Sequence, residues 1–224
     1  MKLLLLNPNR SEWITERVAA GARAVLLPGE SLHTVTSTEG PDVVKSPQQT
    51  LAAAQEVRAL AAAHGAGYDA VILGISLDCG LQQVRVQQGQ QVVIGMTEAA
   101  CLAACTYGPC FGVLTVGAVM QPLYVQHIQA LGLASRCVGV EAPECAQAFQ
   151  PVDGAFDAAA LPVLASAVRA LRSQGADSVV LAGAVLCGLG PELTRRTGVV
   201  VWEGPVCAVG VARMRHAHAA WLRA

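Results

Sequence analysis

The sequence predicts an α/β fold with two similar lobes, each a parallel sheet covered by helices, and a cleft between the lobes. Short apolar runs of strand length alternate with helical segments, which is typical of parallel sheets buried on both faces. One such segment is repeated in the second half of the chain. With 53% hydrophobic residues, the 224-residue chain can bury the cores of two lobes of about 100 residues each.

The elements follow one another in a regular order. The apolar run from Lys2 to Leu6 has the length of a strand and predicts the first one. Its four leucines are too few for the apolar part of a signal peptide. The Asn-Pro-Asn turn after it leads into a helix from about Glu12 to Val25. Further strands are expected at 32–35, 70–74, 92–95, 111–115, 137–140, 178–182 and 199–202, and further helices at 48–64, from 97, at 121–131, at 158–174 and from about 206.

Charge and hydropathy exclude several classes of partner. The 15 Lys+Arg nearly balance the 16 Asp+Glu, so nothing in the charge favours nucleic acid or an anionic membrane. The mean hydropathy of +0.45 is high, yet no apolar run approaches the ~18 residues of a membrane span. A small molecule is therefore the expected partner.

The charged fraction of 14% is sparse cover for a monomer and predicts a homo-oligomer. The eight cysteines, with no export signal, are expected as thiols in a reducing cytoplasm.

A repeat relates the two halves of the chain. Residues 71–81 read VILGISLDCGL and residues 179–189 read VVLAGAVLCGL, and each is preceded by Val-Arg-Ala-Leu on a predicted helix. Two lobes related by a pseudo-twofold axis would place these segments on either side of the cleft. Ligands of parallel sheets bind beyond the carboxyl ends of the strands, and Cys79 and Cys187 both follow such an end.

Two opposed thiols suit the racemisation of a carbon acid. One base removes the proton from one face, and the conjugate acid of the other returns it from behind, each about 3–3.5 Å from the carbon. We expect helix N-termini to lower the pKa of Cys79 and Cys187 below the usual value of about 8.5. Because cysteine is also among the most buried residue types, a purely structural role stays open for both.

The other cysteines are expected to be core or near-core thiols. They are Cys101, Cys105, Cys110, Cys137, Cys145 and Cys207. Cys101 and Cys105 share a helical face, but no further ligand at metal-binding spacing completes a site, so no metal is expected.

Polar residues and glycines at strand ends are candidate substrate-binding residues. They are Asn7, Asn9, Ser11, Gly74, Ser76, Asp78, Thr115 and Gly183. The first three could instead form a turn and a helix cap. Asp78 could cap a helix, contact the ligand or act as a base. The two glycines allow close backbone approach, and no glycine motif for a phosphate cofactor is present, so no cofactor is expected.

The chain resembles the cofactor-independent Asp/Glu/hydantoin racemase superfamily, and within it the hydantoin and allantoin racemases. The resemblance spans nearly the whole chain and is carried by LNPN at 6–9 with Ser11 and Thr15, TEGP at 38–41, Gly74 and Asp78 with GL at 80–81, IGMTEAA at 94–100 and FGVLT at 111–115. It implies two pseudo-symmetric Rossmann-like (flavodoxin-like) lobes, no PLP or metal, and proton transfer at an α-carbon by two thiols. Residues 1–95 would form the first lobe, completed by a C-terminal helix at 205–224, and residues 96–204 the second.

The chain departs from the family at the two catalytic positions. The family pattern places its cysteines where this chain has Ile75 and Gly183, and Cys79 and Cys187 stand four residues later in each half. Our first hypothesis is a racemase of a hydantoin-like or amino-acid-derived small molecule that uses Cys79 and Cys187 as acid and base. Two alternatives stay open: a one-base enzyme, such as a decarboxylase or isomerase of a small dicarboxylate, and a non-catalytic binder that has lost the usual cysteine pair.

Overall fold

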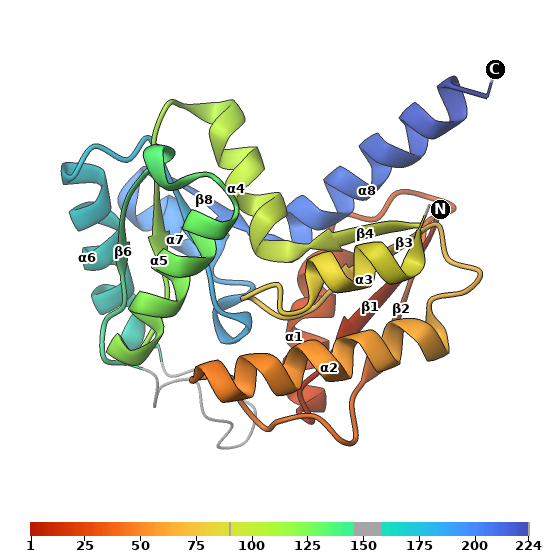
Figure 1. Ribbon diagram of the computed structural model, residues 1–224. Coiled ribbons are helices and arrows are strands. Elements are labelled where there is room, and N and C mark those ends of the chain that lie inside the picture. The colour runs from red at the N-terminus through yellow and green to blue at the C-terminus, as the bar shows by residue number, and fades with distance from the viewer. Residues whose placement is uncertain (90, 146–157, 224) are drawn as a thin grey trace.

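Two four-stranded parallel sheets form the framework of the protein (Figure 1). The computed structural model describes residues 1–89, 91–145 and 158–223. The strand order is β2-β1-β3-β4 in one sheet and β6-β5-β7-β8 in the other, so the second sheet repeats the topology of the first. The strands are β1 (Lys2–Asn7), β2 (Ser31–Thr36), β3 (Ala70–Leu73), β4 (Val92–Gly95), β5 (Phe111–Leu114), β6 (Cys137–Glu141), β7 (Ser178–Leu181) and β8 (Val200–Glu203).

Helices cover both sheets. They are α1 (Glu12–Arg23), α2 (Pro47–His64), α3 (Leu81–Gln88), α4 (Met96–Tyr107), α5 (Gln121–Ala130), α6 (Ala160–Ser173), α7 (Gly190–Thr197) and α8 (Gly204–Trp221), with short 3₁₀ turns η1 (Ala118–Met120), η2 (Ala134–Arg136) and η4 (Ala184–Leu186). The predicted strands end within one residue of the observed ones, and the helices within two. The predicted α/β fold with two lobes is confirmed. The lobe boundaries at 95/96 and 204/205 stay a prediction.

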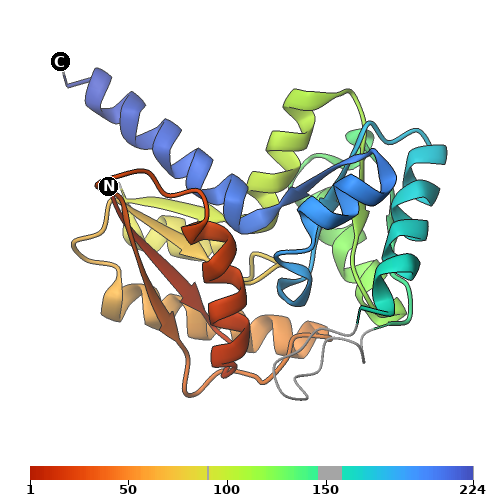
Figure 2. The same cartoon turned by 180° about the vertical axis from the view of Figure 1, so that it is seen from behind.

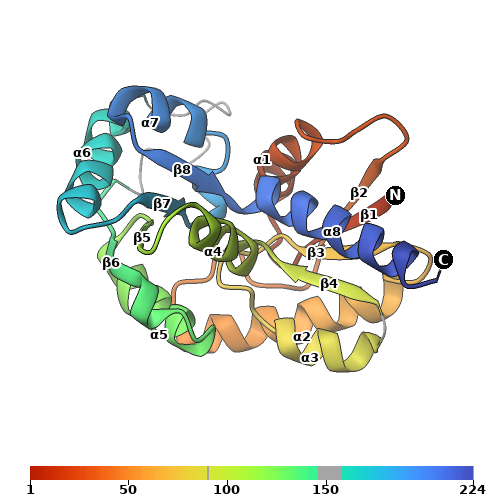
Figure 3. The same cartoon turned by 90° about the horizontal axis from the view of Figure 1, so that it is seen from above.

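The cores consist of aliphatic side chains. The four leucines of β1 are fully buried, as both-face coverage of a central strand requires. Seen from above, α4 and the start of α8 lie between the two sheets (Figure 3), and α8 packs against α4 and α1. Seen from behind, α1 stands beside the turn that precedes α7 (Figure 2). Within the described residues, no helix is long and apolar enough to cross a bilayer.

Buried carboxylates fix the loops that follow the central strands. Asp78, whose side chain is fully buried, accepts hydrogen bonds from the backbone N–H groups of Thr97 (3.1 Å) and Glu98 (2.8 Å) at the start of α4. His127 of α5 contacts the same carboxylate through Nε2 at 3.1 Å. In the second lobe Glu203 accepts from the N–H groups of Gly188 (2.9 Å) and Gly190 (2.6 Å). Each carboxylate satisfies buried N–H groups that would otherwise have no partner.

Removing the Asp78 carboxylate is expected to destabilise the fold. Asp78→Ala leaves two helix N–H groups and His127 without their acceptor in a buried place, which we expect to lower the free energy of unfolding by about 2–4 kcal/mol. Asp78→Asn keeps one acceptor and tolerates the positive φ of 47° at this position, so it should lose less. Urea unfolding measures both. An Asp78→Ala protein within about 0.5 kcal/mol of the native one would show that the carboxylate is dispensable.

Candidate active site

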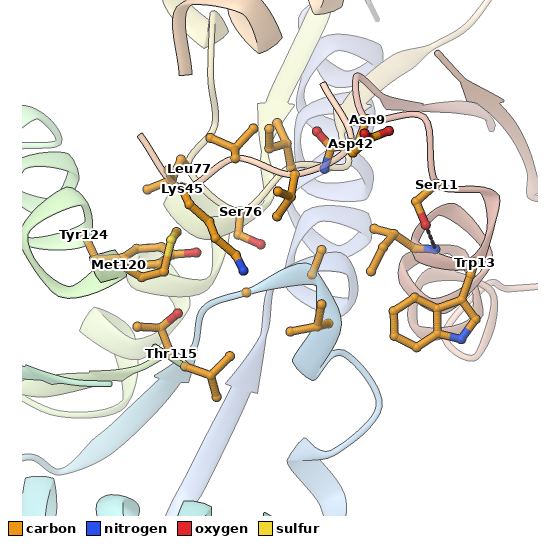
Figure 4. Close-up of a pocket in the computed structure, with 18 residues that line it drawn as sticks. Asn9, Ser11, Trp13, Asp42, Lys45, Ser76, Leu77, Thr115, Met120 and Tyr124 are labelled. Atoms are coloured by element: carbon orange, nitrogen blue, oxygen red, sulfur yellow. Dashed lines mark hydrogen bonds between the residues drawn. The ribbon is translucent and has the colours of Figure 1, made fainter. Parts of the chain in front are cut away.

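A pocket of about 390 Å³ lies between the two sheets, beyond the carboxyl ends of their central strands (Figure 4). The loops after β1, β2 and β3 form one side, and the loops after β5 and β7 with α5 form the other. The lining residues are Asn9, Ser11, Trp13, Ile14, Asp42, Val43, Val44, Lys45, Ile75, Ser76, Leu77, Thr115, Val116, Met120, Tyr124, Gly183, Ala184 and Val185. Its volume suits a small molecule.

The loop after β1 brings Asn9 and Ser11 to the pocket. Asn7, predicted as a binding residue, is fully buried behind them and does not line the pocket. Its Nδ2 donates to the carbonyl of Ser11 (3.1 Å) and to Thr15 Oγ1 (2.9 Å), and its Oδ1 accepts from the N–H of Asn9 (3.0 Å). Asn7 is therefore a positioning residue. Ser11 caps α1 by accepting from the N–H of Ile14.

The loop after β3 presents Ser76 but neither Gly74 nor Asp78. The N–H of Gly74 donates to the carbonyl of Leu6 (2.8 Å), and a Cβ on this glycine would meet Leu5 at 2.8 Å, so Gly74 serves packing against β1. Asp78 turns away from the pocket to cap α4. The carbonyl of Ser76 accepts from the Thr97 hydroxyl, which fixes the loop backbone. Gly74 and Asp78 are therefore not among the lining residues of this pocket, contrary to the expectation that they would face a ligand.

The second lobe contributes Thr115, Gly183 and Tyr124. Thr115 and Gly183 line the pocket as expected, and Gly183 has a φ of 131°, which favours glycine. The ring of Tyr124 is fully buried, and burial raises the pKa of its hydroxyl. Ser76 and Thr115 are close enough to lower that pKa by a smaller amount, but neither is placed for a hydrogen bond with Tyr124. Tyr124 is thus a neutral donor with no acceptor.

Three buried polar atoms of the pocket wall have no hydrogen-bond partner among the described residues. They are Asn9 Oδ1, Ser76 Oγ and Tyr124 Oη. Buried polar atoms are almost always paired, and leaving one unpaired costs about 1–3 kcal/mol. One amide oxygen and two hydroxyl groups, on residues that line one small cavity, match a ligand that offers both N–H and C=O groups.

The two predicted catalytic thiols do not line this pocket. Cys79 and Cys187 are each 4% exposed. Burial first, and the charge of Asp78 second, raise the pKa of Cys79 to about 12, and burial and then Glu203 raise that of Cys187. We expected helix N-termini to lower both pKa values, and desolvation outweighs that effect.

The surroundings of the two cysteines are apolar. Both belong to the buried apolar cluster that extends through the two lobes, and Cys187 also lines a second hollow beside Arg17 and Trp202. The sulfurs therefore do not face each other across the pocket as expected. Within the described residues, no group of three His, Cys, Asp or Glu side chains could hold a metal ion.

The pocket residues Asp42, Lys45 and Tyr124 were not predicted from the sequence. Asp42 and Lys45 follow β2 at the same carboxyl edge of the sheet as the predicted residues, so their position after a strand could have identified them as candidates. Tyr124 lies on α5, and nothing in the sequence of that helix shows which face meets the pocket.

The model of the family described as Asp/Glu/hydantoin racemase matches residues 3–212. The chain belongs to this family. A hydantoin racemase from Paenarthrobacter aurescens is 26% identical over 216 residues, covering 95% of this chain and 89% of that protein. The allantoin racemase structure from Klebsiella pneumoniae is 26% identical with a TM-score of 0.87, covering 98% of this chain and 89% of that one. The corresponding values for the allantoin racemase from Pseudomonas fluorescens are 29%, 0.84, 96% and 90%.

The family and these relatives assign the chain to the racemases, which are isomerases that act on small molecules. In this racemase family member, Ile75 and Gly183 occupy the positions at which the family pattern implies thiols. Both residues line the pocket. The pocket thus has the expected place between the lobes, but no cysteine is among its described lining residues.

Cys79 and Cys187 are expected to react slowly with a thiol reagent in the folded protein. At pH 8 their raised pKa values keep them protonated, and burial restricts access to them. Treatment with a disulfide reagent, followed by mass-spectrometric mapping, should label the half-buried Cys105 and Cys110 first, and Cys79 and Cys187 only after unfolding. Rapid labelling of either buried thiol, with protection by a hydantoin, would restore the two-thiol hypothesis.

Proposed function

We propose that the protein racemises a hydantoin-like or amino-acid-derived small molecule, without a cofactor, by stabilising an enolate in the pocket between the lobes. The observation that carries the proposal is the set of unpartnered polar atoms on Asn9, Ser76 and Tyr124. The family and the hydantoin and allantoin racemase relatives support this class of reaction and substrate. The predictions of a cytoplasmic location and a homo-oligomer stay predictions.

A five-membered cyclic diamide complements these atoms. Its ring N–H groups can donate to Asn9 Oδ1, and its carbonyl oxygens can accept from the hydroxyls of Ser76 and Tyr124. Such a ligand would provide hydrogen-bond partners for the three unpartnered polar atoms. The apolar side chains of Ile75 and Leu77 would contact the faces of the ring or its substituent. The α-proton of a cyclic diamide is also more acidic than that of a free amino acid, so a weak base suffices.

The reaction proceeds through an enolate. A hydroxide ion from the solvent takes the α-proton and becomes water, and the electron pair of the C–H bond moves onto the neighbouring carbonyl oxygen. Tyr124, kept protonated by its raised pKa, donates to that developing oxyanion together with Ser76. Return of a proton from water to either face of the carbon gives both enantiomers and restores the starting composition. No side chain has to stand on each face.

A second candidate is a small-molecule binder without turnover. Ile75 and Gly183, at the positions implied for the two family thiols, favour it. The one-base decarboxylase or isomerase needs a thiol in the pocket, and the described lining contains none. Binding without exchange of the α-proton would identify the binder.

Replacing Tyr124 by Phe is expected to slow racemisation. Tyr124→Phe removes the donor and keeps the buried ring, so we expect about a 10²-fold lower rate with the fold intact. Circular dichroism with a panel of single-enantiomer 5-substituted hydantoins measures racemisation, and proton NMR in D₂O measures exchange at the α-carbon. Tyr107→Phe, an exposed tyrosine outside the pocket, is the matched control.

The cysteine variants separate this route from the two-thiol route. Cys79→Ala and Cys187→Ala should each keep at least about half of the native rate per folded molecule, because neither sulfur lines the pocket. Loss of racemisation in both variants, with native circular dichroism and ligand binding, would contradict the enolate route. Failure of every hydantoin to bind would remove the proposed function altogether.

A further inference from the structure

We infer that Lys45 selects ligands that carry an anionic group, so that the molecule recognised in the pocket is a carboxylate-bearing cyclic diamide. The inference rests on the function proposed above and narrows its substrate class. It is carried by the charge balance at the pocket, by the way the backbone of Lys45 is fixed, and by the unpartnered polar atoms of the same pocket wall.

The mouth of the pocket has an excess positive charge. Among the described lining residues, Asp42 and Lys45 are the charged ones. Asp42 is paired with Arg10, whose Nη2 lies 2.7 Å from Asp42 Oδ1. Lys45 is exposed and has no such ion pair within the described parts of the chain. The protein as a whole has a net charge of -1, so the positive charge at the pocket mouth is opposite in sign to the net charge of the protein.

The backbone of Lys45 is held in place by the start of α2. Ser46 caps this helix by accepting from the N–H of Gln49 (3.3 Å), and Gln49 Oε1 accepts in return from the N–H of Lys45 (2.8 Å). On the other side, Val44 is buried in the core of the first lobe. Lys45 therefore leaves a fixed main chain, and only its side chain is free to adjust to a ligand.

The side chain of Lys45 extends into the pocket towards Ser76 (Figure 4). A diamide ring bound to Asn9, Ser76 and Tyr124 would place its α-substituent within reach of the Lys45 ammonium group, which lies beside Ser76. Met120, on the same side of the pocket as Lys45 (Figure 4), offers an apolar contact to the methylene part of such a substituent. A carboxylate at its end would accept a charge-assisted hydrogen bond from the ammonium group.

Calorimetry with a matched pair of ligands tests the inference. Hydantoin-5-acetic acid and its neutral amide, hydantoin-5-acetamide, have nearly the same size and differ in charge. We expect the native protein to bind the acid about tenfold more tightly at low salt, a modest preference because Lys45 is partly in water. The preference should shrink as the salt concentration rises, whereas binding of the amide should not change.

Lysine variants provide the controls. Lys45→Met should abolish the preference for the acid and leave binding of the amide unchanged, and Lys45→Arg should keep most of it. The sequence contains one other lysine, Lys2, which is exposed at the amino end of β1. Lys2→Met should therefore bind both ligands like the native protein. In the native protein, hydantoin-5-acetic acid should protect Lys45 but not Lys2 from acetylation, as read by mass spectrometry.

The outcomes separate the inference from the proposed function. Equal binding of acid and amide by the native protein, unchanged in Lys45→Met, would overturn the role of Lys45 and leave the proposed function standing. Failure of both ligands to bind would overturn the two together. A tenfold preference lost only in Lys45→Met, with Lys45 protected from acetylation, supports both.

Discussion

The carboxylate of Asp78 holds the pocket loop and both lobes in a single arrangement. It reaches from the loop after β3 to the start of α4, the helix that leads into the second lobe, and it contacts His127 on α5 of that lobe. The pocket residues Ile75, Ser76 and Leu77 come directly before it. Their position therefore depends on buried hydrogen bonds that satisfy the end of a helix, which a low-dielectric interior makes costly to break.

In the second lobe, too, a carboxylate accepts hydrogen bonds from backbone N–H groups, but it comes from a different element. Glu203 lies at the end of β8 and reaches back to the loop before α7, whereas Asp78 lies in the loop and reaches forward to α4. Both link a loop that follows a central strand to the strand-helix junction next to it. The pseudo-symmetry of the fold is thus kept in the pair of segments that is linked, while the carboxylate and the N–H groups have exchanged sides.

The repeated Cys-Gly-Leu segment has a structural explanation. Gly80 and Gly188 both have a positive φ, which favours glycine, and Leu81 and Leu189 are both buried. A Cβ on Gly80 would meet the carbonyl of Ala54 at 2.9 Å, so this turn is packed against α2. The cysteine before each glycine is buried, with 4% of its surface exposed. The same turn in two similar lobes selects the same three residue types, without any demand for thiol chemistry.

Much of the fold and part of the site could be predicted from the sequence. Unbroken apolar strands predict a parallel sheet, and a parallel sheet predicts the edge at which ligands bind. Asn9, Ser11, Ser76, Thr115 and Gly183 line the pocket at this edge, and their binding roles stay predictions. The direction of a side chain within a loop has no such periodicity. Asn7, Gly74 and Asp78 lie at the correct edge but turn into the protein, because each is needed for hydrogen bonding or close packing there.

The two positions at which the family pattern implies thiols show how far this pocket departs from side-chain acid–base chemistry. At position 75 a branched apolar side chain stands in the wall, and at position 183 the backbone has a φ of 131°, where any residue with a Cβ is strained. A thiol at 183 would therefore require a different path for the loop from β7 to η4, not only a different side chain. What the wall retains is a set of unpaired hydroxyl and amide groups around a small cavity. Such a wall can lower the energy of an enolate without itself accepting the proton, so the geometry favours stabilisation of the intermediate over proton transfer by opposed bases.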